Sequence, residues 1–414
     1  MTTPPTGPAF AALNGLSVGD ALGAQFFVPA TARAHFTTRT DPPGPWPWTD
    51  DTEMACSVYA VHTERGTIDT FDLTHAFARR HDFDRGYGPS ANRLLRLIRE
   101  GGDAKALAAG MFEGQGSYGN GAAMRVAPLG AAYAEDPSAV VGPAADTAVI
   151  THTHPQAVDG AIAVAVAAAY AAGARTEPMA PGVFLGCVLD LTPSGAVRDG
   201  LAEAIALLGE PDLRVAAKVL GNGSRTSAAD TVPYALWCAA RHLGDYRAAV
   251  WEAIAAGGDV DTVAAITGGV VAARTGTHGI PAAWMAAREQ LPSWTFTEPG
   301  SVQPVPPGDT RLKPLRLPRP APVPDVVWTD EQWQRIRTRK IAGSWVHRTE
   351  EGVLHLHRVW SGSAIWSVRV APVPGGGWRP VSALVEAHPK HYAGGPDGLV
   401  ALLREASGDD RLRP

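Results

Sequence analysis

Two short acidic stretches, far apart in the chain, have the residue types of a cation site. Residues 48–52 read Trp-Thr-Asp-Asp-Thr, and residues 257–262 read Gly-Gly-Asp-Val-Asp-Thr. An apolar pattern of helical period follows each stretch, so each is expected to open a helix with its carboxylates at the N-terminal end. Two unrelated helix caps would explain only one aspartate in each stretch. Four aspartates brought together repel each other, and a pair of divalent cations would relieve that repulsion. Carboxylate and hydroxyl oxygens suit Mg²⁺ or Mn²⁺ rather than zinc.

A glycine-rich stretch at residues 114–125, Gly-Gln-Gly-Ser-Tyr-Gly-Asn-Gly-Ala-Ala-Met-Arg, has the composition of an anion-binding loop. Glycines this dense before a helical pattern let backbone N–H groups face an anion. A plain glycine-rich turn is the alternative, because the spacing is not that of a Walker motif and no strand pattern precedes it. Further along, His152 and His154 precede an alanine-rich helical pattern and could bind a ligand or a metal.

The elements that must position these residues are helices, because no convincing period-two pattern occurs before residue 300. Gly15, Gly19 and Gly23 recur every four residues on the first helix. Each costs roughly 1 kcal/mol of helix propensity, so the stripe predicts close approach of another backbone. Asp20, beside the stripe, is either a hydrogen-bonding anchor or a residue that steers the cation site. A proline-rich loop, residues 26–48, leads to the first acidic stretch. The predicted helices span residues 10–23, 51–62, 71–80, 91–99, 103–111, 156–172, 197–208, 212–220, 231–242, 246–256, 259–274 and 281–290.

Composition narrows the class of protein. The chain has 414 residues, of which 45% are hydrophobic and 19% charged, as in globular proteins. A net charge of −5 gives no indication of direct nucleic-acid binding. Three widely spaced cysteines do not form a metal or redox motif. The N-terminus lacks the pattern of a signal peptide, and the apolar run at 161–172 is too short to span a bilayer. We therefore expect a cytoplasmic protein without a membrane partner.

The composition changes after residue 297. Residues 298–327 are rich in proline and are predicted to be an extended linker. Residues 328–414 contain six of the twelve tryptophans and are predicted to form a small α+β domain. Helices are expected at 330–337 and 397–405, and strands at 344–349, 353–360 and 364–370. His355 and His357 are expected on the solvent-facing side of a strand.

Five motifs resemble, in the same order, those of the ADP-ribosylglycohydrolase family, of the dinitrogenase reductase-activating glycohydrolase type. They are residues 19–23, 48–52, 116–125, 151–155 and 257–262. The resemblance covers about residues 10–290. It implies an all-α orthogonal helical bundle for residues 1–297, followed by the small C-terminal α+β module. It also implies a glycosidase with two divalent cations, Mg²⁺ or Mn²⁺, that releases ADP-ribose from an ADP-ribosylated protein or other acceptor.

The resemblance also assigns roles to residues. Water would attack C1″ after losing a proton to an aspartate, through a transition state with oxocarbenium character. The implied catalytic residues are Asp50, Asp51 and Asp259. The implied metal ligands are Thr49, Asp50, Asp51, Asp259, Asp261 and Thr262. The implied substrate-binding residues are Asp20, Gly116, Ser117, Tyr118, Gly119, Asn120, Gly121, Met124, His152 and His154.

The chain departs from the family pattern at two positions. Val260 stands where many members have threonine, and it is expected to point away from the cavity. Phe27 stands where many members have a glutamate, for which Asp82 or Asp84 could substitute. That departure supports an alternative, a catalytically altered ADP-ribose-binding or structural member. A phosphohydrolase built on His81 and Asp82 lacks a clear set of further histidines.

Two matters lie beyond the resemblance. The acceptor is open among arginine, serine, a nucleobase and a free metabolite. The C-terminal module, residues 328–414, is expected to recognise the modified macromolecule or to mediate assembly.

Overall fold

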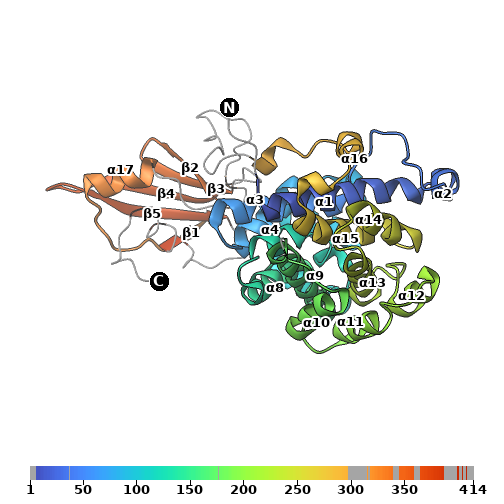
Figure 1. The fold of residues 1–414 in the computed structure, drawn as a ribbon. Coiled ribbons are helices and arrows are strands. Elements are labelled where there is room, and N and C mark those ends of the chain that lie inside the picture. The colour runs from blue at the N-terminus through green and yellow to red at the C-terminus, as the bar shows by residue number, and fades with distance from the viewer. Residues whose placement is uncertain are drawn as a thin grey trace. The chain divides into compact units, whose positions relative to one another are not determined.

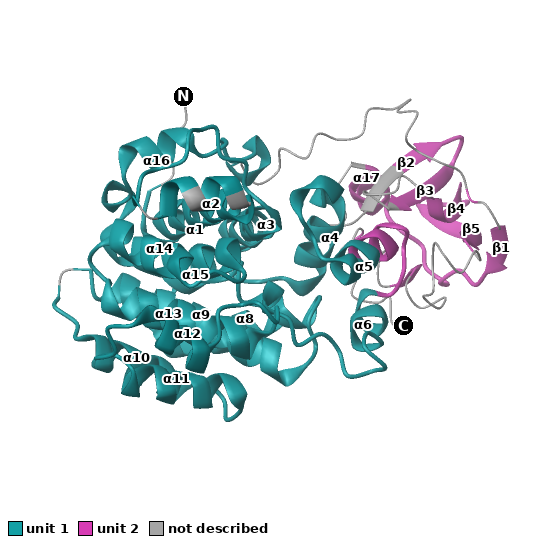
Figure 2. Ribbon diagram, turned by 90° about the vertical axis from the view of Figure 1, so that its right-hand side faces the viewer, with its two compact units in different colours: residues 1–94, 104–298 teal, residues 95–103, 299–414 magenta. Residues whose placement is uncertain are grey.

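The structure is a computed structural model with two compact units. One unit comprises residues 1–94 and 104–298, and the other comprises residues 95–103 and 299–414 (Figure 2). The second unit therefore takes in a short segment from the first part of the chain as well as the C-terminal part. The structure describes residues 6–36, 38–175, 177–296, 315, 318–338, 345–358, 364–386, 399, 400, 403 and 407.

The described part of the chain before residue 297 is helical, as predicted (Figure 1). Its longer helices are α1 (Pro8–Ala24), α3 (Asp50–Arg65), α4 (Thr70–Arg80), α5 (Pro89–Arg99), α9 (Pro155–Gly173), α10 (Pro181–Leu191), α11 (Ala196–Ala206), α13 (Ala228–Arg241), α14 (Tyr246–Ala255) and α15 (Val260–Thr275). Shorter ones are α2 (Pro29–Phe36), α6 (Ala104–Ala109), α7 (Ala127–Ala132), α8 (Val141–Val149), α12 (Leu213–Leu220) and α16 (Ala282–Ala287).

Three helices differ from the sequence expectation. The loop predicted at 26–48 contains α2, and the sequence did not indicate α8 or α10. Helix α10 reads Pro-Gly-Val-Phe-Leu-Gly-Cys-Val-Leu-Asp-Leu, which is apolar almost throughout. Such a helix has no contrast between its faces, so the period of 3.6 is hidden.

Helices α1 and α15 lie antiparallel with their backbones in close contact, which confirms the prediction from the glycine stripe. A Cβ atom built on Gly15 would lie 2.4 Å from the carbonyl oxygen of Gly268. One on Gly19 would lie 2.2 Å from the carbonyl oxygen of Ala264. These distances are far below van der Waals contact, so only glycine permits this approach. The stripe thus sets the separation of the helices that carry the site.

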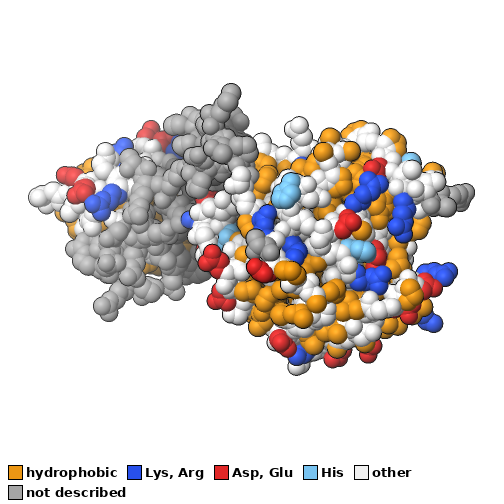
Figure 3. All heavy atoms as spheres, in the orientation of Figure 1, with side chains coloured by type: hydrophobic (Ala, Val, Ile, Leu, Met, Phe, Trp, Pro, Cys, Tyr) orange, Lys and Arg blue, Asp and Glu red, His pale blue; other side chains and the backbone are white. Residues whose placement is uncertain are grey.

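Helix α9 lies beside α15 in the interior. By length and composition it could cross a membrane, with a mean hydropathy of 1.3 over its 18-residue window, but 78% of that window is buried within the protein. Its many alanines allow it to pack closely against its neighbours, as expected for an internal helix. On the face shown in Figure 3, the described basic side chains are interspersed with acidic and apolar ones and form no continuous basic surface.

The second unit contains a five-stranded antiparallel sheet with the order β1-β5-β4-β3-β2. The strands are β1 (Pro318–Ala321), β2 (Trp345–Glu350), β3 (Val353–Arg358), β4 (Ala364–Pro372) and β5 (Trp378–Glu386), and helix α17 (Asp330–Thr338) follows β1. Trp328 and Trp333 stack with their ring centroids 6.2 Å apart, and both belong to the buried core of this unit.

Two expectations for this unit need correction. Residues 318–321, predicted as linker, form edge strand β1, a position that tolerates proline because one side of the strand makes no ladder hydrogen bonds. His357, predicted to face solvent, is only 5% exposed. Its neighbour His355 lies 2.8 Å from the hydroxyl of Ser367 on the adjacent strand, so this side of the sheet is partly a buried polar surface. Residues 298–314, 316 and 317 of the predicted linker lie outside the described residues. So do residues 344, 359 and 360 of the predicted strands and most of the predicted helix at 397–405.

Candidate active site

The N-terminal end of α3 is held by one buried carboxylate on α1. One oxygen of Asp20 accepts hydrogen bonds from the backbone N–H groups of Thr49, at 2.9 Å, and Thr52, at 3.2 Å, and from the Thr52 hydroxyl, at 2.5 Å. Its other oxygen accepts from the Thr49 hydroxyl at 2.8 Å. Asp20 therefore acts as the hydrogen-bonding anchor, the first of the two roles considered for it. Its contact with substrate stays a prediction.

The N-terminal end of α15 is held by backbone contacts. A Cβ atom on Gly23 would lie 2.6 Å from Cα of Asp261, so α1 again touches the helix directly. The Asp259 N–H donates to the carbonyl oxygen of Asn222 at 3.0 Å. Gly258 has a φ of +81°, and a Cβ there would lie 2.2 Å from the same Asn222 oxygen. The glycine before Asp259 is therefore needed both for its backbone angle and for space.

The two helix starts meet at Asp51, as the sequence predicted for a shared site. One carboxylate oxygen of Asp51 lies 3.3 Å from the Thr49 hydroxyl and 3.4 Å from the Thr262 hydroxyl. Thr262 is 211 residues further along the chain. The second oxygen of Asp51 is buried and has no hydrogen-bond partner among the described residues. Burying a carboxylate oxygen without a hydrogen-bond partner costs free energy unless the oxygen is protonated or binds a cation.

The buried carboxylates of this cluster would be stabilised by a bound cation. Burial raises the pKa of Asp20 to about 6, and burial together with the charge of Asp20 raises the pKa of Asp50 to about 8. The pKa values of Asp51 and Asp261 lie well above the usual range, mainly through burial and then through neighbouring aspartates. Burial also raises the pKa of Asp259. A divalent cation would offset the repulsion that keeps these groups protonated.

The donor set fits a hard divalent cation in its chemistry. It combines four carboxylates with the hydroxyls of Thr49 and Thr262, all oxygen ligands of the kind preferred by Mg²⁺ and Mn²⁺. Among the described residues, no three His, Cys, Asp or Glu side chains are already arranged as a complete ligand set. The unpartnered oxygen of Asp51 and the repulsion between the carboxylates still favour a cation, because side-chain rotation costs little free energy beside the burial of a charge.

The glycine-rich loop keeps only some of its N–H groups available. Three are used internally: Gly116 donates to the Met111 carbonyl at 3.0 Å, Gly119 to the Ser117 hydroxyl at 3.2 Å, and Asn120 to the Thr226 carbonyl at 2.9 Å. In the described structure the N–H groups of Ser117 and Tyr118 have no partner. An anion in this loop would therefore be bound by a narrower set of donors than the predicted run from Gly116 to Gly121.

His152 and Met124 lie directly beneath the glycine loop. A Cβ atom on Gly121 would lie 3.0 Å from Nε2 of His152 and 3.9 Å from the sulfur of Met124. The other ring nitrogen of His152 lies 2.7 Å from the Thr151 hydroxyl. Burial lowers the pKa of His152 to about 3, so the ring is neutral. His152 thus packs against the glycine-rich loop at Gly121.

His154 has a different place. Its Nδ1 accepts the Gln156 N–H at 3.1 Å and so caps α9, while its ring lies 5.8 Å from that of Tyr118. Both histidines therefore lie at the glycine loop, and their contact with substrate stays a prediction.

Asn120 joins the glycine loop to the acidic cluster. Its side-chain amide donates to Asp259 at 2.6 Å and to the Thr231 hydroxyl at 3.0 Å. The sequence implied a role for Asn120 in substrate binding, and the structure adds that its side chain orients a predicted metal ligand.

Two further residues were missed by the sequence analysis. Glu53 is buried one turn after Asp50, and it accepts hydrogen bonds from the Tyr87 hydroxyl at 2.7 Å and the Asp82 N–H at 3.1 Å. Its spacing of three from Asp50 places both residues on one helix face, and this spacing is the signal by which the sequence could have indicated Glu53.

Phe112 is the second of these residues. It is 49% exposed, and its ring centroid lies 6.3 Å from that of Tyr118, which is 47% exposed.

The positions that depart from the family pattern are also placed. Phe27 is 52% exposed, so an aromatic side chain faces solvent where the glutamate was expected. Val260 is buried, with only 4% of its surface exposed. Asp82 and Asp84 are both exposed, and Asp82 accepts the Asp84 N–H at 3.1 Å. Their substitution for the glutamate stays a prediction.

Comparisons with known proteins agree with the arrangement of the motifs. A family model described as ADP-ribosylglycohydrolase matches residues 4–301. ADP-ribosylhydrolase ARH3 of Xenopus tropicalis is 29% identical over 276 residues, which cover 58% of this chain and 77% of the relative. ADP-ribosylhydrolase ARH3 of Bos taurus is 30% identical over 273 residues, with coverage of 58% and 74%.

A bacterial relative and a solved structure extend the likeness. ADP-ribosyl-[dinitrogen reductase] glycohydrolase of Rhodospirillum rubrum is 31% identical over 167 residues, which cover 36% of this chain and 54% of the relative. A solved chain described as an ADP-ribosylglycohydrolase-related protein complex superposes with a TM-score of 0.51 at 26% identity, covering 70% of this chain and 94% of its own length.

Proposed function

The chain belongs to the ADP-ribosylglycohydrolase family, and we propose that it is a metal-dependent ADP-ribosyl hydrolase. It would cleave the N- or O-glycosidic bond at C1″ of an ADP-ribosylated acceptor and release ADP-ribose. The observation that carries the proposal is the meeting of two distant helix starts at Asp51, where the hydroxyls of Thr49 and Thr262 lie 3.3 and 3.4 Å from one carboxylate oxygen.

Two divalent cations, Mg²⁺ or Mn²⁺, would be held by the residues of the two helix starts. The ligands would be Thr49, Asp50, Asp51, Asp259, Asp261 and Thr262. When bound, such cations hold vicinal hydroxyls and make water more acidic, which is the chemistry that cleavage at C1″ needs.

Asp50 is the aspartate best placed to move a proton. Asp50 and Asp259 are partly exposed, whereas Asp51 and Asp261 are buried, and Asp259 already accepts a hydrogen bond from the Asn120 amide. Without metal, burial raises the pKa of Asp50 to about 8, and bound cations would lower it, so near neutral pH its carboxylate would be the base that accepts a proton. Asp50 would take a proton from water as the water oxygen bonds to C1″. It would return the proton to the acceptor as the bond from C1″ to the acceptor breaks.

The glycine loop would bind the rest of the ADP-ribose. The free N–H groups of Ser117 and Tyr118 would donate to the diphosphate. The exposed rings of Phe112 and Tyr118, 6.3 Å apart, offer aromatic faces for adenine. His152 and Met124 would keep the loop in this conformation from below.

One observation favours a second candidate, a member that binds ADP-ribose without cleaving it. Phe27 cannot act as an acid, a base or a metal ligand where many relatives have a glutamate. The complete set of acidic and threonine residues at the two helix starts supports hydrolysis instead, because a binding protein would not need all of them.

A release assay separates the two candidates. The protein is incubated with Mg²⁺ or Mn²⁺ and with arginine-, serine- and nucleobase-linked ADP-ribose, and free ADP-ribose is measured. We expect metal-dependent release from at least one substrate and a loss of at least about a hundredfold in Asp50→Ala and Asp259→Ala. Asp136→Ala, which removes an exposed aspartate, serves as the control. Metal binding without release from any substrate would favour the binding protein.

A further inference from the structure

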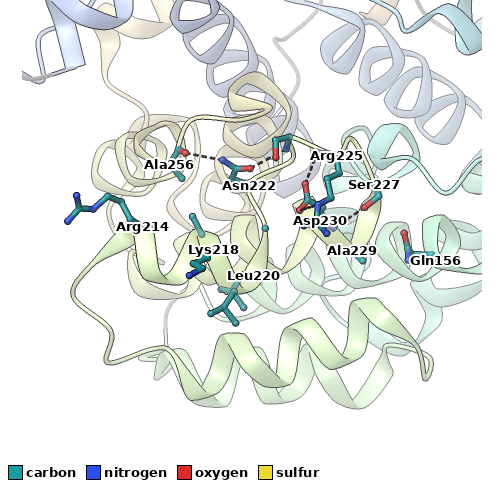
Figure 4. A pocket seen from close by; sticks show the side chains of 14 residues that line it. Gln156, Arg214, Lys218, Leu220, Asn222, Arg225, Ser227, Ala229, Asp230 and Ala256 are labelled. Atoms are coloured by element: carbon teal, nitrogen blue, oxygen red, sulfur yellow. Dashed lines mark hydrogen bonds and ion pairs between the residues drawn. The ribbon is translucent and has the colours of Figure 1, made fainter.

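A cavity of about 570 Å³ opens between α12 and the loop of residues 221–227 (Figure 4). None of the residues that line it belongs to the acidic cluster or the glycine loop. Its volume lies within the range of about 300 to 1,000 Å³ that is usual for small-molecule sites. Residues that line it include Gln156, Arg214, Lys218, Ser224, Arg225 and Asp230.

The charge of this cavity favours an anion. Three basic side chains and one carboxylate line it. Arg214 is paired with Asp212 at 2.9 Å and extends outward in Figure 4. Lys218 has no ion-pair partner in the described part of the chain, and Arg225 lies 3.9 Å from Asp230, a loose contact. Lys218 and Arg225 can therefore both turn toward a negatively charged ligand.

The other lining groups suit hydroxyls rather than a flat ring. The cavity has no aromatic lining residue, so it lacks the surface on which a nucleobase would stack. The side chains of Ser224 and Gln156 make no hydrogen bond to other described residues and are free to bind a ligand. One oxygen of Asp230 accepts the Arg225 N–H at 2.8 Å, and its other oxygen can accept from a ligand hydroxyl. Because cations, hydroxyl, amide and carboxylate groups are combined without an aromatic face, we propose that this cavity binds a free sugar phosphate.

The loop on one side of this cavity also holds the acidic cluster. The Asn222 carbonyl accepts the Asp259 N–H at 3.0 Å, and the Thr226 carbonyl accepts the Asn120 N–H at 2.9 Å. A Cβ atom on Gly223 would lie 2.4 Å from Cβ of Asp259, so the loop and the carboxylate are in close contact. Binding in the cavity should therefore change metal affinity at Asp259. This consequence rests on the proposed metal centre, whereas binding itself does not.

Calorimetric titration of the full chain with ribose 5-phosphate, in EDTA, tests the site. We expect saturable binding that persists with saturating ADP-ribose present. Charge reversal of both cations, in the double variant Lys218→Glu and Arg225→Glu, should weaken binding at least tenfold. Arg93→Glu, an exposed change elsewhere on the chain, should leave it unchanged. Circular dichroism of each variant checks that it is folded.

Each other outcome would overturn the proposal. Equal binding by the double variant would place the ligand elsewhere, and displacement by ADP-ribose would assign it to the glycine loop. Equally tight binding of inorganic phosphate would remove the role of the sugar, and equally tight binding of ribose would remove that of the phosphate. None of these results depends on ADP-ribose release, so failure here is distinct from failure of the proposed hydrolase. A repeat titration with Mn²⁺, with and without ribose 5-phosphate, then measures the effect on metal affinity.

Discussion

The starts of α3 and α15 carry similar side chains but are held in place by opposite means. The N-terminal end of α3 is held by the carboxylate of Asp20, which accepts four hydrogen bonds from Thr49 and Thr52. The α15 start lies against α1 where Gly19 and Gly23 have no side chain at all. Both supports come from one short segment of α1, in which Gly19 and Asp20 are consecutive.

This difference shows how a five-residue motif can place two distant helices. The glycines of α1 position α15 through close backbone contact, which does not depend on pH. A buried carboxylate fixes α3 by hydrogen bonds, which depend on its charge. Residues 19–23 therefore act as a spacer between the two halves of the acidic cluster, and each half can be disturbed separately.

Disturbing the steric support should have the largest effect. In Gly19→Ala the new Cβ would lie 2.2 Å from the backbone oxygen of Ala264, which cannot rotate away. We expect the free energy of unfolding to fall by about 3 kcal/mol or more. Urea unfolding measures it. Gly142→Ala, in α8 and with no atom within 4 Å of the new Cβ, is the control and should change stability by less than about 1 kcal/mol. Equal effects of the two variants would contradict the steric account.

Disturbing the polar support should have a smaller effect. Asp20→Asn keeps the size of the side chain, but its amide nitrogen cannot accept from Thr49 or Thr52. We expect a loss of about 2 kcal/mol of stability, because buried donors lose their partner. Urea unfolding and Mn²⁺ titration measure the two consequences. Asp136→Asn, at an exposed helix cap, is the control and should lower stability less than Asp20→Asn does. A stable Asp20→Asn variant with normal metal binding would remove Asp20 as the anchor of α3.

The sequence could predict this arrangement where the signal is local. The four-residue spacing of Gly15, Gly19 and Gly23 indicates a close helix contact without any knowledge of the partner helix. The acidic pairs that begin at Asp50 and Asp259 indicate repulsion between carboxylates, which cations bound at one shared site would relieve. Such patterns lie within a few residues, so helical geometry alone makes them readable.

The remaining contacts could not be predicted, because they join segments with no common pattern. The amide of Asn120 reaches Asp259 across 139 residues, and the carbonyl of Asn222 fixes the same aspartate from another loop. In the second unit, the prolines of β1 favour an extended linker, whereas the segment pairs with β5 as a strand. Tertiary pairing overrides local propensity in such a case.

The pH dependence of stability should separate the two supports further. Burial raises the pKa of Asp20 to about 6 and, with the charge of Asp20, that of Asp50 to about 8, both from 3.8. The folded protein therefore binds more protons than the unfolded chain, so this stability is complete below pH 3.8 and is lost as pH rises toward 8. The slope is at most about 1.4 kcal/mol per pH unit for each proton.

Urea unfolding in EDTA from pH 5 to 9 measures this slope. Asp50→Asn should flatten its upper part, whereas Gly19→Ala should lower the whole curve without changing its shape. A wild-type stability that rises between pH 6 and 8 without metal would contradict the assignment of both groups.

The smallest expected effect tests whether the α15 start has a polar support of its own. The Asn120 amide donates to Asp259 at 2.6 Å, and this hydrogen bond partly counters the rise in the Asp259 pKa that burial causes. In Asn120→Ala the carboxylate should hold its proton more tightly. Mn²⁺ affinity should fall about tenfold, the usual effect of removing a group that orients a metal ligand.

Manganese titration followed by electron paramagnetic resonance measures that change. Thr231→Val is the matched control, because it removes the other partner of the Asn120 amide and leaves Asp259 untouched. A tenfold loss in Asn120→Ala alone, with stability within about 1 kcal/mol of wild type, would show that α15 combines steric support with a hydrogen bond from the glycine loop. Unchanged Mn²⁺ affinity would mean that only the close contact with α1 and the Asn222 loop hold the start of α15. Side-chain hydrogen bonds would then position α3 but not α15.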